Sequence, residues 1–152
     1  MTQDLYEVRA RGLIRIGEDG IARENDAAVD AYFAPEFIFH GPGGDMRLTD
    51  LKAYFASMRS AFTDFTVSRQ AIVVQGDLMG ARTTIAGIFT HVFEQSPIGT
   101  LAPTGRPMAL HLINLFRYDA DGRLAEEWAQ YDNIAFLQDL GVEMAPVSRQ
   151  NS

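Results

Sequence analysis

The chain has 152 residues, no cysteine and a formal net charge of −7, with an isoelectric point near 4.8. The acidic balance argues against nucleic acids and anionic membrane surfaces as partners, because clustered Lys and Arg recognise both. The lack of cysteine excludes disulfides, thiolate zinc sites and cysteine nucleophiles. A chain of this length with 47% hydrophobic residues is expected to form one domain with a full core.

The first third of the chain is patterned for helices. Apolar residues recur on one helical face over Asp4–Ile16, and the glycines of 17–20 are expected to end this helix. A short second helix over Ala27–Phe33 follows Asp26, which can cap it. A short strand over Phe37–His40 comes next, and a third amphipathic helix starts at position 49 or 50 and runs to about Phe62.

After residue 64 the pattern becomes strand-like. Long strands are predicted over Phe65–Gln75, Leu78–Phe93, Met108–Tyr118 and Arg123–Tyr131. A loop rich in Gly, Pro, Ser and Thr is expected over Glu94–Pro107, and a last short helix over Ile134–Leu140. Residues 1–142 are interpreted as one domain and 143–152 as a C-terminal tail.

Helices grouped before an antiparallel meander predict an α+β domain with its helices on one face of the sheet. A sheet of long strands with internal glycines is expected to curl. A curled sheet closed by three helices encloses an interior pocket, which is the usual form of a small-molecule site. The N-terminus shows no secretory signal and no apolar run is long enough to span a membrane, so a cytoplasmic location is the expectation.

Short segments spread over most of the chain resemble the SnoaL-like polyketide cyclase family. The segments that carry the resemblance are Asp30–Phe37, His40–Gly44, Phe62–Phe65, Gln75–Asp77, Thr90-His91, Pro103–Pro107, Arg117-Tyr118, Gly122–Trp128, Asp132 and Leu140-Gly141. The resemblance implies the cone-shaped fold of nuclear-transport-factor-2-like proteins: a curved antiparallel sheet packed on three N-terminal helices. It does not fix the reaction, because one fold can carry many chemistries.

Two departures from the family pattern stand out. Its usual Gly-Thr-His-x-Gly segment reads Phe89–Phe93 here, without either glycine. The cyclases of the family use an Asp as acid/base, and matching of residues puts Glu126 at that position. Alternation along the strand groups Glu126 with the bulky Leu124 and Trp128, which predicts that Glu126 faces the interior. A carboxyl group in an apolar cavity should have a raised pKa.

His111 is the second candidate catalytic residue, because it lies between two leucines and could donate to a developing enolate oxygen. Asn114 could orient a substrate carbonyl. The two residues differ by three positions and should point to opposite faces unless a bulge intervenes, so one of them is expected outside the pocket. A surface position for Glu126 and a purely structural role for His111 are the alternative interpretations.

Further residues are expected to contact the ligand. His91 lies near the loop that would rim the pocket, Trp128 would form its wall, and Asp132 either caps the last helix or reaches the pocket. The aromatic and thioether residues expected to line it are Phe39, Tyr54 and Met58. His40 is interpreted as a surface or turn residue. The three histidines lack metal-ligand spacing, so no metal is expected. No Gly-rich phosphate loop follows a strand, so no nucleotide cofactor is expected either.

The leading hypothesis is an enzyme that performs cofactor-free acid/base chemistry on a hydrophobic, carbonyl-containing small molecule. The resemblance implies an aldol-type cyclisation; an isomerisation would use the same groups. A non-catalytic binding protein and an epoxide hydrolase of similar fold are the alternatives, and the latter requires two carboxylates bridged by an inward arginine. A homodimer is also expected, because the strand over Met108–Tyr118 is apolar on both faces.

Overall fold

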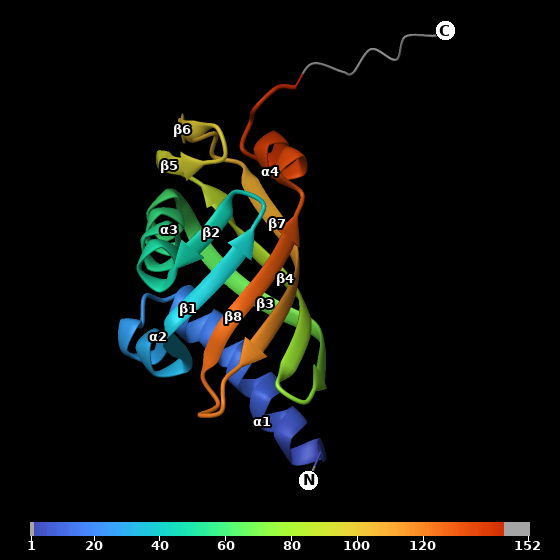
Figure 1. The fold of residues 1–152 in the computed structure, drawn as a ribbon. Coiled ribbons are helices and arrows are strands. Elements are labelled where there is room, and N and C mark those ends of the chain that lie inside the picture. The colour runs from blue at the N-terminus through green and yellow to red at the C-terminus, as the bar shows by residue number, and fades with distance from the viewer. Residues whose placement is uncertain (1, 145–152) are drawn as a thin grey trace, which may run out of the picture.

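Six strands form one curved sheet in the computed structural model, which describes residues 2–144. Their order is β2-β1-β8-β7-β4-β3 (Figure 1). The strands are β1 (Phe33–Gly41), β2 (Gly44–Arg47), β3 (Phe62–Gln75), β4 (Leu78–Phe89), β7 (Pro107–Tyr118) and β8 (Leu124–Tyr131). Of the predicted tail, only residues 143 and 144 fall within the described part of the chain.

Helices cover one face of this sheet, which confirms the predicted α+β fold. They are α1 (Thr2–Arg15), η1 (Ile16–Ile21), α2 (Asp26–Tyr32), α3 (Leu48–Ala61) and, at one end, α4 (Asn133–Asp139). The glycines of 17–20 do not end the first helix as predicted. They continue it as the π-helical turn η1, where small residues let the chain pack closely: a Cβ at Gly17 would lie 3.2 Å from the Val67 carbonyl oxygen. The cap of α2 is Asn25 rather than Asp26, since its side chain accepts from the Ala28 amide at 3.1 Å.

The sheet is mixed rather than fully antiparallel. β1 pairs in parallel with β8, while every other neighbouring pair in the large sheet is antiparallel. β1 and β8 are far apart in the sequence and no hairpin fixes their relative direction. The long strand predicted up to Phe93 ends earlier, at Phe89. A small hairpin, β5 (Phe93–Ser96) with β6 (Gly99–Leu101), occupies part of the predicted loop and turns at Gly99, where φ is +102°.

Bulges bend the sheet around its inner face. In β3 the pairing with β4 shifts around Asp64 and again around Ala71, and both residues have positive φ. The core between the sheet and the helices contains fully buried phenylalanines, among them Phe37, Phe89 and Phe116. None of the helices within residues 2–144 has the length and apolar character needed to cross a membrane.

Candidate active site

A cavity lies between the inner face of the sheet and the helices. Its walls are mainly apolar and include Phe33, Phe39, Phe55, Ile85, Leu110 and Leu112. Four polar side chains enter this cavity from four adjacent strands: Arg69 on β3, Thr83 on β4, Asn114 on β7 and Glu127 on β8. A few convergent polar groups in an otherwise apolar cavity are typical of a site that orients a small molecule.

The four polar side chains form one directed chain of hydrogen bonds. Arg69 Nη1 donates to Thr83 Oγ1 at 2.8 Å, and Thr83 Oγ1 donates to Asn114 Oδ1 at 2.6 Å. Asn114 Nδ2 then donates to Glu127 Oε2 at 2.9 Å. An arginine can only donate and a carboxylate can only accept, so the direction of the whole chain follows from its two ends. These hydrogen bonds hold the Glu127 carboxyl group in a fixed position.

Glu127 is buried, with 7% of its surface exposed, and is the single carboxylate among the described residues that line the cavity. Burial disfavours its charged form and raises the pKa of Glu127 to about 7, against the opposing effects of Arg69 and of the hydrogen bond from Asn114. A carboxyl group with this pKa is present in both protonation states near neutral pH. It can therefore accept a proton and return it, as general acid/base catalysis requires.

Arg69 places a cation at the other end of this chain of hydrogen bonds. Burial lowers the pKa of Arg69, and the charge of Glu127 is the largest influence opposing that shift. The guanidinium lies over the ring of Phe116, 5.3 Å from its centroid. Among the described residues no carboxylate oxygen lies within 4.0 Å of the Arg69 guanidinium, so the cavity holds a cation without a direct ion pair.

The predicted interior position of Glu126 is wrong, and a bulge is the physical reason. Tyr118 on β7 pairs with Leu124, whereas Arg117 pairs with Glu126, so Ala125 has no partner of its own. This extra residue reverses the alternation. Leu124 faces the core, and beyond the bulge Glu127, Ala129 and Tyr131 take the inner face while Glu126 and Trp128 take the outer one.

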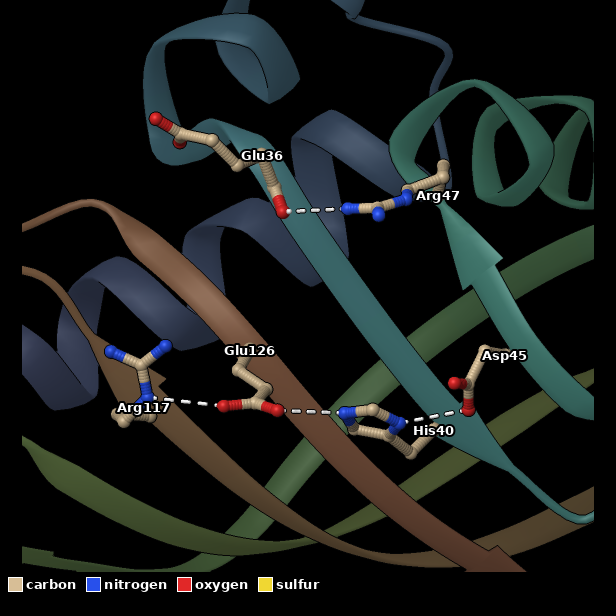
Figure 2. Close-up of polar contacts among 6 residues, drawn as sticks. All are labelled: Glu36, His40, Asp45, Arg47, Arg117 and Glu126. Atoms are coloured by element: carbon tan, nitrogen blue, oxygen red, sulfur yellow. Dashed lines mark hydrogen bonds and ion pairs between the residues drawn. The ribbon is translucent and has the colours of Figure 1, made fainter.

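Glu126 belongs instead to a polar cluster on the outer face of the sheet (Figure 2). His40 Nε2 lies 2.7 Å from Glu126 Oε2, and His40 Nδ1 lies 2.8 Å from Asp45 Oδ1. Arg117 Nε donates to Glu126 Oε1 at 3.2 Å. The hydrogen bonds from His40 and Arg117 lower the pKa of Glu126, which is the opposite of the predicted direction. The hydrogen bonds to Glu126 and Asp45 raise the pKa of His40.

His111 and Asn114 lie on opposite faces of β7. Burial alternates without interruption from Met108 to Phe116, so Asn114 points into the cavity and His111 points out. The His111 ring contacts Thr84 on the outer face, with Nδ1 at 3.3 Å from Thr84 Oγ1. His111 therefore cannot contact a ligand held inside the cavity.

The remaining candidates are divided between the cavity, the core and the surface. Phe39 and Tyr54 line the cavity, whereas Met58 is fully buried outside its lining. Trp128 is 37% exposed on the outer face and stacks on His40, with ring centroids 5.4 Å apart. His91 is exposed after β4. Asp132 caps α4 by accepting from the Ala135 amide at 3.0 Å, the structural alternative of the two predicted for it.

Sequence reasoning missed Arg69, Thr83 and Glu127. Arg69 could have been found from its spacing to Val67, an apolar residue two positions earlier on the same strand. Glu127 could not, because nothing in the sequence reveals the bulge at Ala125. Within residues 2–144, no group of three or more His, Asp or Glu side chains is arranged to hold a metal ion.

Comparisons with known proteins agree with the fold. A family model described as SnoaL-like polyketide cyclase matches residues 13–140. IdmH from Streptomyces antibioticus, a proposed polyketide cyclase, is 28% identical with a TM-score of 0.67, over 88% of this chain and 96% of its own. AclR from Streptomyces galilaeus, a proposed hydroxylase, is 18% identical with a TM-score of 0.76, over 93% of this chain and 87% of its own. No curated protein gives a significant match to the sequence.

Proposed function

The chain belongs to the SnoaL-like polyketide cyclase family, and on this premise we propose that its interior cavity performs cofactor-free acid/base catalysis. The ligand would be a hydrophobic small molecule with a carbonyl group. The observation that carries the proposal is the buried Glu127 carboxyl group, with a pKa raised to about 7 and a position held by Asn114. Aldol-type cyclisation and isomerisation are the reactions that these groups suit.

Glu127 would be the catalytic residue. Its carboxylate removes a proton from the carbon next to the ligand carbonyl, and the electron pair of the broken C–H bond moves to the carbonyl oxygen as an enolate. In a cyclisation the enolate carbon attacks a second carbonyl carbon of the same molecule, and the resulting alkoxide takes the proton back from Glu127. In an isomerisation the protonated Glu127 returns the proton to a different carbon. Asn114 is the positioning residue, because it donates to Glu127 Oε2.

The epoxide-hydrolase alternative is disfavoured by the cavity. It requires two carboxylates bridged by an arginine around a water molecule. Arg69 supplies an inward arginine, but Glu127 is the single carboxylate among the described lining residues. Arg117, another strand arginine, lies on the outer face and donates to Glu126. The remaining alternative is a non-catalytic binding protein, and an experiment must distinguish it from an enzyme.

Hydrogen exchange in D₂O tests the proposal without knowledge of the natural substrate. Apolar ketones such as 2-tetralone have acidic hydrogens next to the carbonyl, and their replacement by deuterium is followed by NMR. We expect the protein to accelerate this exchange and Glu127→Gln to abolish the acceleration. Glu126→Gln is the matched control, since it removes the adjacent carboxylate from the outer face and should leave the rate unchanged.

Two results would contradict the proposal. If Glu127→Gln exchanges the ketone as fast as the unaltered protein, Glu127 is not the base. If the unaltered protein binds the ketone without accelerating exchange, the binding-protein alternative is favoured.

A further inference from the structure

Arg69 is a partly buried cation, and among the described residues it lacks a direct anionic partner. Its guanidinium makes one hydrogen bond among the described residues, from Nη1 to Thr83, and its Nε is buried without an acceptor. Glu127, the one carboxylate of the described cavity lining, is linked to it only through Thr83 and Asn114. A cation held in apolar surroundings without a contacting anion is costly, and such an arrangement favours a ligand that brings a negative charge.

The neighbours of Arg69 occupy its other sides, so an anionic partner would have to bind from the cavity. The π-helical turn η1 closes one side, because a Cβ at Gly17 would lie 3.4 Å from Arg69 Nε. The ring of Phe116 covers another, and Thr83 occupies Nη1. Arg69 itself belongs to the cavity lining, together with apolar side chains that would hold the rest of a ligand. A guanidinium presents several donors in one plane, which suits two oxygens that share a charge.

We infer that the cavity binds its ligand as an oxygen anion, the enolate of an acidic carbonyl compound or a carboxylate, against the Arg69 guanidinium. Glu127 carries a proton in this complex, as it does after it has taken the ligand's proton in the proposed reaction. This inference deepens the proposed function, because it rests on the same cavity and assigns its substrate class. Arg69 stabilises the negative oxygen. The protonated Glu127 avoids the repulsion of two negative charges in one apolar space.

Proton linkage follows from this arrangement. The titratable groups that influence Glu127 and Arg69 are each other, Tyr32 on α2, Tyr118 on β7 and Tyr131 on β8. Burial raises the pKa of all three tyrosines, so they stay neutral between pH 5 and 9. Among these groups, Glu127 is then the one whose protonation changes between pH 5 and 9. An anion bound beside it should draw a proton onto Glu127 when the pH is near or above 7.

Calorimetric titration with two probes of equal shape tests the inference. 1-Naphthoate carries a carboxylate, and 1-naphthamide is its neutral counterpart. At pH 6 we expect the unaltered protein to prefer 1-naphthoate by about tenfold or more, as for a charge-assisted contact. Arg69→Met should remove the preference while both probes still bind, and Arg69→Lys should keep part of it. Arg82→Met is the matched control, because Arg82 is an exposed arginine on the neighbouring strand β4.

The unaltered protein provides a second readout that needs no Arg69 variant. Titrations in two buffers of different ionisation enthalpy at pH 7.5 should show proton uptake with 1-naphthoate, and Glu127→Gln should abolish that uptake. Equal affinity for the two probes, or a preference that survives Arg69→Met, would overturn the inference. That failure differs from failure of the proposed function, since ketone exchange that depends on Glu127 would still stand.

Discussion

Glu126 and Glu127 are adjacent in the chain and lie on opposite faces of β8, where their surroundings shift their pKa values in opposite directions. His40 and Arg117 hold the pKa of Glu126 below its ordinary value. Burial in the cavity raises the pKa of Glu127 to about 7. One bulge residue, Ala125, places the two carboxyl groups in these different environments.

Replacement of Glu127 should stabilise the fold at neutral and alkaline pH. The folded-state pKa is raised, so the contribution of Glu127 to stability is fully present below its unfolded value near 4.5 and is lost as the pH rises through 7. Glu127→Gln cannot lose a proton. The variant should match the unaltered protein near pH 4 and exceed it by about 3 kcal/mol in the free energy of unfolding above pH 7. Urea unfolding across this range measures the difference.

Glu126, the adjacent carboxylate, is the control, because its effect on stability should change with pH in the opposite direction. The lowered pKa of Glu126 means that its contribution is present above the unfolded value and is lost as the pH falls through the folded value. Glu126→Gln should therefore be less stable at neutral pH, by less than about 1 kcal/mol for a half-exposed ion pair, and should approach the unaltered protein in acid. Parallel pH profiles for the two variants would contradict their placement on opposite faces.

The fold was predictable because its signals are local, whereas the site was only partly predictable. Helix amphipathicity and strand alternation placed most elements within a few residues, and alternation along β7 correctly separated His111 from Asn114. Alternation failed on β8, where the extra residue Ala125 reverses the faces. A bulge is set by pairing with neighbouring strands, which a single sequence does not show. Arg69 follows Val67 by two positions on a stretch of β3 whose pairing with β4 is unbroken, so alternation from Val67 was sufficient to place it on the inner face.

His40 should stabilise the fold most strongly in mild acid. It joins the β2 residue Asp45 to the β8 residue Glu126, and these hydrogen bonds raise its pKa. Its contribution is fully present below the unfolded value near 6.5 and is lost as the pH rises through the raised folded value. His40→Gln should therefore destabilise the protein by about 1 kcal/mol or less at pH 6 and progressively less in alkali. In a Glu126→Gln background this pH dependence should shrink, and an unchanged profile there would rule out the pair.

Gly87 should be essential for the bend between β3 and β4. A Cβ at this position would lie 2.8 Å from Phe62 Cβ and 3.1 Å from the Thr63 carbonyl oxygen. Neither neighbour can move without shifting the start of β3. Gly87→Ala should lower the free energy of unfolding by about 1–3 kcal/mol, as overpacking of a core does. Gly43→Ala is the matched control because a Cβ there meets nothing within 4 Å, and equal losses from both would refute the steric argument.

We propose that a second copy of the chain covers the outer face of the sheet. Val73 on β3, Ile113 and Leu115 on β7 and Trp128 on β8 are 66%, 61%, 42% and 37% exposed, and all four line one hollow of that face. Contiguous apolar surface of this kind marks an interaction site. The protein should therefore sediment as a dimer, and Ile113→Asp should shift it toward monomer because a carboxylate would be buried at the contact. Val8→Asp, at an equally exposed valine on α1, should leave the dimer intact. A monomer at every concentration, or equal dissociation by both substitutions, would contradict this assembly.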